Sequence, residues 1–329
     1  MIITQTPLRI SFAGGGTDLK EFYEMEDGKV ISSAIDKYIF VIVSERFDEK
    51  IYINYTKKEI VDSVDDIQHE LVREAMRKAG IENGIEVTML ADIPSEGSGL
   101  GSSSSLTVGL LNAFYIYQGE QVPPERLARE ACEIEIDICG KPIGKQDQYI
   151  AAFGGIREFT FKSNGEVLVE KVKLSPSEFR RLGSELLLFY TNKTRKSSEI
   201  LNEQKHSTRS KRDYLHQLKL FVPQVRNAIE SHQYHIIGEI LHESWQVKKQ
   251  LASKITNPDI EQMYEMALSA GALGGKVAGA GGGGFLLLYV PRHKQEAVRN
   301  ALREYRELPF YLEQDGSKVI FNLRRYPAR

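Results

Sequence analysis

Cysteine, tryptophan and an excess of charge of either sign are nearly absent from this sequence. Its 329 residues include one tryptophan and two cysteines, Cys132 and Cys139. These cysteines lie two helical turns apart in a segment predicted to be helical, which is too far for a disulfide. With 43 Lys and Arg against 45 Asp and Glu, the chain lacks the basic excess of proteins that bind nucleic acids or acidic membranes. We expect a reduced, cytoplasmic protein.

Long hydrophobic runs are missing as well. The longest uncharged stretch, residues 277–291, is rich in glycine and too short to span a bilayer. The first residues lack a basic segment followed by an apolar run, so we expect no signal peptide. Hydrophobic residues make up 41% of the chain and charged residues 27%, which is typical of a globular protein rather than a disordered one.

Strand-like and helix-like segments are mixed along the chain without strict alternation. Runs of β-branched and aromatic residues predict strands at 2–12, 38–43, 51–55, 84–91, 154–161, 167–172, 186–190, 284–290 and 319–323. Periodic apolar residues predict helices at 67–79, 102–117, 123–139, 197–231, 235–252, 259–270 and 294–305. The pattern loosens around residues 174–182. We therefore predict an α+β fold of two domains, residues 1–175 and 176–329, with the active site in the cleft between them.

The first of three glycine-rich segments covers residues 7–18. A strand that contains Arg9 runs into the turn Gly14-Gly15-Gly16, which is followed by Thr17 and Asp18. Glycines in such a turn let the backbone approach a ligand closely. Asp18 is suited to accept hydrogen bonds from sugar hydroxyls, but it is equally suited to cap the next helix. The residues alone leave both interpretations open.

The second segment, residues 94–105, leads from a strand through glycines into a predicted helix. Free N–H groups and the dipole at the start of that helix favour a phosphate group. The segment is not a standard P-loop, because no lysine follows its glycines, and it lacks the third glycine of a dinucleotide-binding turn. A serine-capped turn without a ligand is the alternative. The candidate phosphate-binding residues are Gly97, Ser98, Gly99, Leu100, Gly101, Ser102 and Ser103.

The third segment, residues 274–284, contains seven glycines. Three of them match the spacing of a dinucleotide-binding turn, but a strand follows instead of a helix. We predict a flexible loop that packs beside the second segment, and a tight bend between helix and sheet is the alternative. So many glycines carry a large entropic cost, which argues against a purely structural role.

Two carboxylates and a basic cluster complete the candidate residues. Glu135 flanks the apolar stripe of its predicted helix and is suited to be a partly buried metal ligand, whereas Glu133 points away and is predicted to be solvated. Asp147 precedes an apolar helical turn, where a helix N-cap is the alternative to a catalytic role. The basic run at residues 193–196 is either a solvated surface or a site for a substrate phosphate.

Together, these segments resemble the motifs of the GHMP kinases, named for galactokinase, homoserine kinase, mevalonate kinase and phosphomevalonate kinase. The three motifs occur in the family's order and span nearly the whole chain. The resemblance implies an ATP-dependent sugar kinase in which Gly97–Ser103 cradle the ATP phosphates. It also implies that Ser103 and Glu135 hold Mg²⁺. The loop expected to close on the nucleotide contains Gly279, Gly281 and Gly282.

The resemblance also implies how an acceptor sugar would be held. Asp147 would orient or deprotonate the reacting hydroxyl, and Arg9 beside it would offset developing charge. Galactokinases have Glu-His where this chain has Gly15-Gly16, which argues against galactose. The predicted substrate contacts are Gly15, Gly16, Thr17, Asp18, Asp147, Lys193 and Arg195. Lys196 is an alternative to the last two as the contact for a phosphate on the substrate.

Within the family, residues 144–155 and the turn before Asp18 resemble most the kinases that phosphorylate the anomeric hydroxyl of D-glycero-D-manno-heptose 7-phosphate. Kinases for L-fucose or another free sugar are the alternative. A non-catalytic sugar or nucleotide sensor on the same fold is an alternative of another class, although such proteins usually lose the equivalents of Asp147 or Glu135. We expect a small-molecule partner, no nucleic acid and no membrane, with a homodimer left open.

Overall fold

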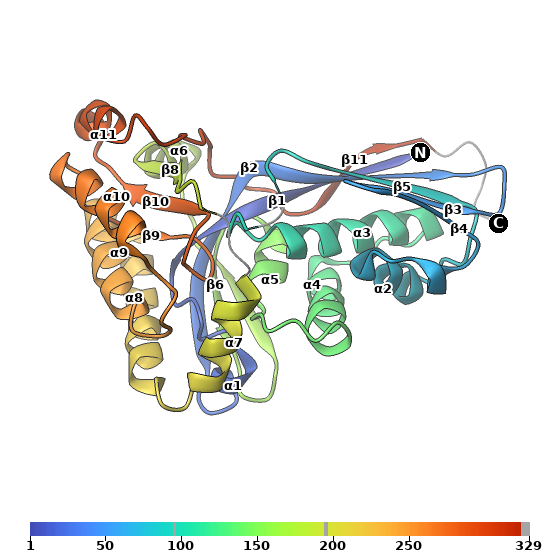
Figure 1. The fold of residues 1–329 in the computed structure, drawn as a ribbon, viewed down its shortest axis with the longest axis horizontal. Coiled ribbons are helices and arrows are strands. Elements are labelled where there is room, and N and C mark those ends of the chain that lie inside the picture. Colours follow the sequence, from blue (N-terminus) through green and yellow to red (C-terminus); the bar gives the residue numbers. More distant parts are fainter. Residues whose placement is uncertain (95–96, 194–196, 324–329) are drawn as a thin grey trace.

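Two β-sheets organise the chain, which the computed structural model describes for residues 1–94, 97–193 and 197–323 (Figure 1). Among these residues the larger sheet has eight strands in the order β11-β1-β2-β5-β3-β4, with β6 paired to β2 and β7 paired to β6. Its strands are β1 (Ile2–Ala13), β2 (Gly28–Glu45), β3 (Ile51–Asn54), β4 (Lys58–Val61), β5 (Ile85–Ala91), β6 (Ile156–Phe161), β7 (Val167–Lys171) and β11 (Lys318–Asn322).

Helices cover one face of the larger sheet. In Figure 1 they lie below its long strands, with α3 running along them. Leu110, Leu111 and Phe114 of α3 are completely buried, and burial of large apolar side chains is the main force that joins helix and sheet. The helices of this part are α1 (Lys20–Tyr23), α2 (Glu70–Ala79), α3 (Ser102–Gln118), α4 (Pro124–Cys132) and α5 (Gln146–Phe153).

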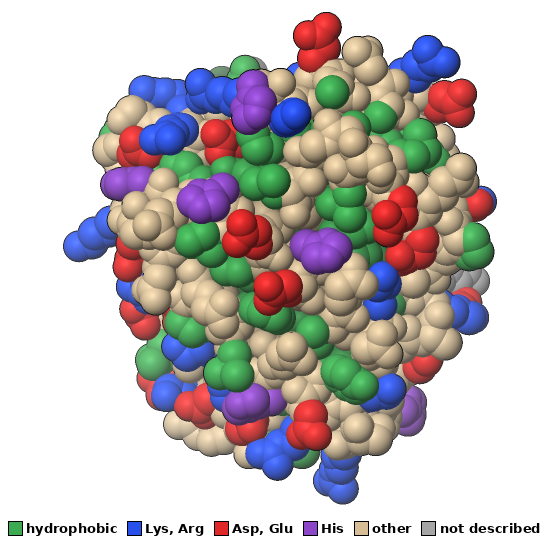
Figure 2. All heavy atoms as spheres, turned by 90° about the vertical axis from the view of Figure 1, so that its left-hand side faces the viewer, with side chains coloured by type: hydrophobic (Ala, Val, Ile, Leu, Met, Phe, Trp, Pro, Cys, Tyr) green, Lys and Arg blue, Asp and Glu red, His purple; other side chains and the backbone are tan. Residues whose placement is uncertain are grey.

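The smaller sheet has the order β8-β10-β9, and its strands are β8 (Leu186–Tyr190), β9 (Gly274–Val277) and β10 (Phe285–Tyr289). The helices that accompany it are α6 (Pro176–Gly183), α7 (Ser197–Ser207), α8 (Arg212–Glu230), α9 (His235–Lys248), α10 (Pro258–Ser269) and α11 (Gln295–Ala301). Helix α10 begins one residue before the predicted position, with Pro258 in its first turn, and the Asn257 side chain caps it by accepting a hydrogen bond from the N–H of Ile260. Figure 2 shows basic, acidic and histidine side chains intermixed on the face that these helices form.

The predicted α+β class is confirmed, and several element boundaries are corrected. Strand β2 is much longer than the predicted 38–43, and the single helix predicted at 197–231 is two helices, α7 and α8. Part of the third glycine segment forms strand β9 rather than a loop. The predicted division into domains between residues 175 and 176 stays a prediction. Strand β11 comes from the predicted second domain, but it pairs with β1 in the sheet of the first.

The most consequential correction concerns the predicted helix 123–139. Its α-helical part ends at Cys132, and residues Glu133–Ile138 form a π-helical turn (η2). A π-turn adds one residue per hydrogen-bonded ring and rotates the following side chains relative to a regular helix. Two further findings on the described residues are that both cysteines are free and that no helix is long and apolar enough to cross a membrane.

Candidate active site

The three glycine segments meet around a cavity of about 530 Å³. The cavity lies at the N-terminal end of α3, where the loop after β1, the turn before α5, helix α7 and the loop after β9 come together (Figure 1). Of the predicted site residues, those that line it are Arg9, Gly15, Gly16, Asp18, Gly97, Ser98, Gly99, Gly101, Ser102, Ser103, Asp147 and Gly279. Residues far apart in sequence thus form one site.

The start of α3 presents unused backbone donors. Gly101 is the N-cap in a left-handed conformation (φ +82°), and no side chain caps this end of the helix. The N–H group of Ser105 bonds to the Gly101 carbonyl, which leaves the N–H groups of Ser102, Ser103 and Ser104 without a helical partner. Because these groups lie at the positive end of a 17-residue helix beside the cavity, they can bind an anion such as a phosphate group.

The second and third glycine segments are in direct contact, as the sequence predicts. A Cβ atom on Gly99 would lie 2.5 Å from the Ala278 carbonyl oxygen, and one on Gly279 would lie 2.8 Å from the Gly99 Cα. Both residues also have positive φ angles. The two backbones can therefore approach this closely only because both positions lack a side chain.

We expect Gly99→Ala to weaken ATP binding and to lower the melting temperature. The left-handed conformation alone costs a residue with a Cβ atom about 1–2 kcal/mol, and the overlap with Ala278 adds to this. Gly80→Ala is the matched control, because Gly80 has φ +69° but no atom within 4 Å of its Cβ position. Calorimetric ATP titration and thermal melts should show the larger loss for Gly99→Ala, and equal effects of both variants would contradict the close contact.

Arg9 and Asp147 form a two-bonded ion pair at the cavity wall. Arg9 Nε lies 2.7 Å from Asp147 Oδ1, and Arg9 Nη2 lies 2.6 Å from Oδ2. The third guanidinium nitrogen, Nη1, donates to the Gly99 carbonyl at 2.5 Å. Arg9 is 5% exposed, so the pair is held rigidly and links the carboxylate to the second glycine segment. Asp147 lies in the first turn of α5 and is not its N-cap, which is Lys145.

Asp18 connects the first glycine turn to the start of α5. Its Oδ1 accepts the N–H of Gly16 at 3.0 Å, and its Oδ2 accepts the N–H of Gln146 at 3.1 Å. Burial raises the pKa of Asp18, while the bond from Gln146 opposes this effect. The alternative that Asp18 caps the next helix is wrong, because the N-cap of α1 is Leu19. Asp18 instead binds the backbone of Gln146, the first residue of α5 and the neighbour of Asp147.

Glu135 lies deeper than the sequence predicts. Its side chain is completely buried, and its oxygens accept hydrogen bonds from the Ser103 hydroxyl and from Gln148 Nε2 at 2.7 Å. The π-helical turn η2 contains Glu135, and such turns frequently occur at functional sites. Glu133 behaves as predicted, since it is partly exposed and pairs with Lys78 at 2.7 Å.

Ser103 and Glu135 fit a Mg²⁺ ion in their chemistry. A hydroxyl and a carboxylate are hard oxygen donors, and Mg²⁺ in phosphate-binding sites is commonly held by one or two such groups together with substrate phosphates. Lys141 Nζ lies 3.1 Å from Ser103 Oγ and 3.6 Å from Glu135 Oε1, so this oxygen pair already attracts a cation. Among the described residues, no group of three or more His, Cys, Asp or Glu side chains is arranged to hold a metal.

Several predicted site residues lie outside the cavity wall. Thr17 is buried in its own turn, where its hydroxyl bonds to the carbonyls of Gly14 and Lys29. Leu100 is also buried, and its carbonyl accepts the N–H of Arg9. Gly281 and Gly282 pack against Ile255, and the buried Glu135 is likewise not among the residues that line the cavity.

The predicted basic cluster gives a mixed result. Lys193 is half exposed and forms an ion pair with Asp259 at 2.7 Å. It is not one of the residues that line the cavity. Arg195 and Lys196 lie outside the described residues. Their role in binding a substrate phosphate therefore stays a prediction.

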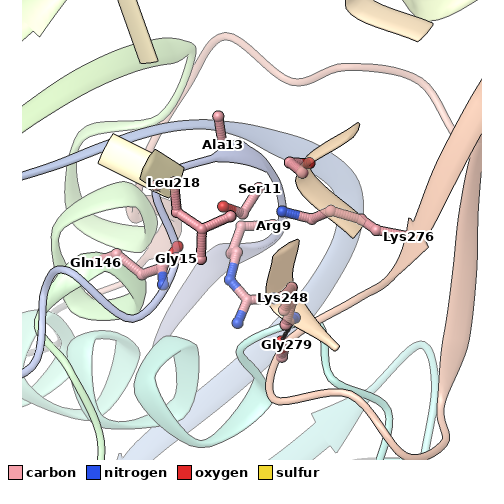
Figure 3. Close-up of a pocket in the computed structure, with 11 residues that line it drawn as sticks. Arg9, Ser11, Ala13, Gly15, Gln146, Leu218, Lys248, Lys276 and Gly279 are labelled. Atoms are coloured by element: carbon pink, nitrogen blue, oxygen red, sulfur yellow. Dashed lines mark hydrogen bonds between the residues drawn. The ribbon is translucent and has the colours of Figure 1, made fainter. Parts of the chain in front are cut away.

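Sequence reasoning missed three lysines of the site. Lys141 and Lys248 line the large cavity, and Lys248 Nζ donates to the carbonyls of Val277 (3.3 Å) and Gly279. Lys276 points into a small recess beside the cavity, which Figure 3 shows together with Arg9 and Lys248. Only Lys276 had a signal in the sequence, because it stands inside the third glycine segment. Neither Lys141 nor Lys248 lies in a segment that the sequence marks as part of the site.

Comparison with known proteins identifies the family. The model of the GHMP kinases N terminal domain matches residues 66–155, and the GHMP kinases C terminal model matches residues 225–307. The chain is also 31% identical over 320 residues to D-glycero-alpha-D-manno-heptose 7-phosphate kinase of Campylobacter jejuni, covering 92% of this chain and 93% of that protein. The chain belongs to the GHMP kinase family.

Two further relatives of this GHMP kinase carry sugar names. A crystal structure of a D-glycero-D-manno-heptose 1-phosphate kinase from Bacteroides thetaiotaomicron is 25% identical with a TM-score of 0.83, covering 98% of this chain and all of that one. L-fucokinase/L-fucose-1-P guanylyltransferase of Bacteroides fragilis is 27% identical over 90% of this chain and 35% of that longer protein. The resemblance inferred from the glycine segments is confirmed, and the chain is a sugar kinase of a family that uses ATP as phosphate donor.

Proposed function

We propose that this GHMP kinase transfers the γ-phosphoryl group of ATP to the anomeric hydroxyl of D-glycero-D-manno-heptose 7-phosphate, which yields the 1,7-bisphosphate. The observation that carries the proposal is the Arg9–Asp147 ion pair, which holds a carboxylate at the wall of the same cavity as the uncapped start of α3. Phosphoryl transfer needs this pairing of an acceptor-orienting carboxylate with a phosphate cradle.

The nucleotide side of the site follows from the glycine segments. The free N–H groups of Ser102–Ser104 and the α3 dipole would hold the ATP phosphates. Gly279 and Ala280 line the same cavity from the C-terminal part of the chain, and they would cover the transferred group. Such positioning supplies most of the rate enhancement in phosphoryl transfer.

The acceptor side centres on Asp147. Its carboxylate would take the proton of the sugar hydroxyl while the hydroxyl oxygen forms a bond to the γ-phosphorus. The bond from that phosphorus to the bridging oxygen breaks, and ADP leaves. Arg9 fixes both carboxylate oxygens, so Asp147 meets the hydroxyl in one orientation.

Mg²⁺ bound at Ser103 and Glu135 would neutralise charge on the ATP phosphates. The chain's own part is to aim the Glu135 carboxylate, which the bonds from Gln148 and Ser103 do. Lys141 supplies a further positive charge at the same oxygens.

The choice of a phosphorylated heptose rests on the two heptose kinases among the relatives and on the open wall at Gly15. Gly15 lines the cavity, and a Cβ atom on it would meet only the Gln146 amide, at 3.8 Å. The cavity therefore has room for a longer sugar there. Free sugars such as L-fucose are the second candidate, which the similarity to the fucokinase favours.

A substrate panel tests the proposal. We expect ATP-dependent ADP formation with heptose 7-phosphate, and a kcat/KM at least about 100-fold lower with L-fucose, galactose and mannose, because the lost phosphate contacts are charge-assisted. A coupled ADP assay measures all four sugars side by side. Comparable turnover of L-fucose would assign the chain to the free-sugar kinases, and no turnover of any sugar would contradict the proposal.

A further inference from the structure

A small recess adjoins the large cavity behind Arg9. Its volume is about 20 Å³, and it shares Arg9, Gly15, Gln146, Lys248 and Gly279 with the wall of the large cavity. The recess is therefore a side pocket of the active site. Space of this size admits one water-sized group or an oxygen or two of a phosphate.

The polar side chains around the recess are rich in donors. Lys276 reaches from β9 toward Ser11 and the stem of Arg9, as Figure 3 shows. Lys248 lies at the edge that the recess shares with the large cavity, and Ser11 lies on β1. No Asp or Glu is among the described residues that line the recess. Such a lining suits a group that only accepts hydrogen bonds.

Two of these side chains lack the partners that buried polar groups normally have. Ser11 is 8% exposed, and its hydroxyl oxygen has no hydrogen-bond partner. Lys276 is 5% exposed, and its Nζ donates to the Phe12 carbonyl at 3.3 Å. In the part of the chain that the structure describes, Lys276 has no ion pair with a carboxylate. Both arrangements cost free energy of folding, which a ligand in the recess would offset.

Burial also changes the protonation equilibrium of Lys276. Burial lowers the pKa of Lys276 to about 7, and the positive charge of Arg9 acts in the same direction. An anion beside the amine would favour its charged form. A charged lysine is thus costly at this buried position unless a negatively charged group binds beside its amine.

We propose that this recess binds the phosphate group that the sugar substrate already carries, with Lys276, Lys248 and Ser11 as its contacts. The inference rests on the proposed function, which it deepens by locating the second phosphate. Arg9 lies in the walls of both the recess and the large cavity, so the phosphate would bind beside the same side chain that holds Asp147. The sugar then bridges them. This location differs from the exposed basic cluster at Lys193.

The test compares variants on a matched pair of sugars, D-glycero-D-manno-heptose with and without its 7-phosphate. Lys276→Met should raise the KM for the 7-phosphate by about 10–100-fold, the usual effect of a lost charge-assisted hydrogen bond. It should leave the KM for the free heptose within about twofold. Ser11→Ala should show a smaller shift of the same kind. Lys248 is not used, because Met at that position would also disturb the third glycine segment.

Thermal stability separates this role from a structural one. Since both side chains are buried without full partners, Lys276→Met and Ser11→Ala should keep or raise the melting temperature of the ligand-free protein. Lys249→Met is the matched control, because the neighbouring Lys249 pairs with Glu261 at 3.0 Å. It should change neither KM. A lower melting temperature for Lys276→Met with an unchanged KM would overturn the proposal, and so would a phosphate-specific effect of Lys193→Met.

A second measurement does not depend on turnover. With ADP present to occupy the glycine loop, inorganic phosphate should raise the melting temperature of the wild type and of Lys249→Met, but not of Lys276→Met. Equal shifts in all three proteins would overturn the recess as a phosphate site. If the wild type phosphorylates neither heptose yet shows the Lys276-dependent shift, the proposed function fails and the phosphate site stands.

Discussion

Asp147→Asn should lower kcat by about 10²–10⁴, the usual contribution of a general base, and should leave the KM for ATP nearly unchanged. The amide has nearly the shape of the carboxylate and can still accept one hydrogen bond from Arg9. It cannot take the hydroxyl proton. Steady-state ADP formation at saturating ATP and sugar measures the effect, and melts followed by near-ultraviolet circular dichroism establish that the variant is folded.

The control for this prediction is Asp137→Asn. Asp137 is an exposed carboxylate ten residues earlier in the sequence, so its replacement changes net charge equally without touching the cavity. We expect wild-type kcat for this variant. A kcat for Asp147→Asn within about threefold of the wild type would exclude Asp147 as the base, because even a weak general base contributes more than that.

Glu135→Gln should weaken the binding of divalent cations by at least about 10–100-fold, since even the partners of metal ligands contribute that much. The fold should tolerate the change. Gln148 Oε1 is buried without a hydrogen-bond partner, so rotation of the Gln148 amide gives the new amide group an acceptor. The substitution then removes the negative charge of Glu135 while the side chain keeps its size and its hydrogen bond to Gln148. Electron paramagnetic resonance with Mn²⁺ and a non-hydrolysable ATP analogue measures the affinity directly.

Glu133→Gln provides the comparison, since Glu133 lies two residues away in the same π-helical turn and pairs with Lys78 outside the cavity. It should bind Mn²⁺ like the wild type. Unchanged Mn²⁺ affinity in Glu135→Gln would show that Glu135 has only a structural role in holding Ser103 and Gln148.

Local chemistry made much of this site predictable from the sequence. Glycine and serine at the start of α3 mark an uncapped helix end, and the contact of Gly99 with the third segment follows from how many glycines both loops contain. The contrast between Glu135 and Glu133 followed from helical periodicity. Helical periodicity did not predict that the Glu135 side chain is completely buried. Glu135 lies in the π-helical turn η2, and residue propensities do not reveal such turns.

Long-range packing set the features that the sequence did not indicate. Lys248 ends α9 and Lys276 lies on β9, and only the tertiary fold brings them to the same recess as Ser11. Strand β11 likewise joins the first strand of the larger sheet from the far end of the chain. Apolar patterns predict that a strand forms, but they do not specify which edge it joins.

The position of the new phosphate on the product tests the central claim most directly. After reaction of the wild type with ATP and heptose 7-phosphate, ³¹P nuclear magnetic resonance should show the original phosphate and a second one coupled to the anomeric proton. The second resonance should build up about 10²–10⁴ times more slowly with Asp147→Asn. A new phosphate on any other hydroxyl, or ADP formation without a new sugar phosphate, would contradict transfer to the anomeric oxygen.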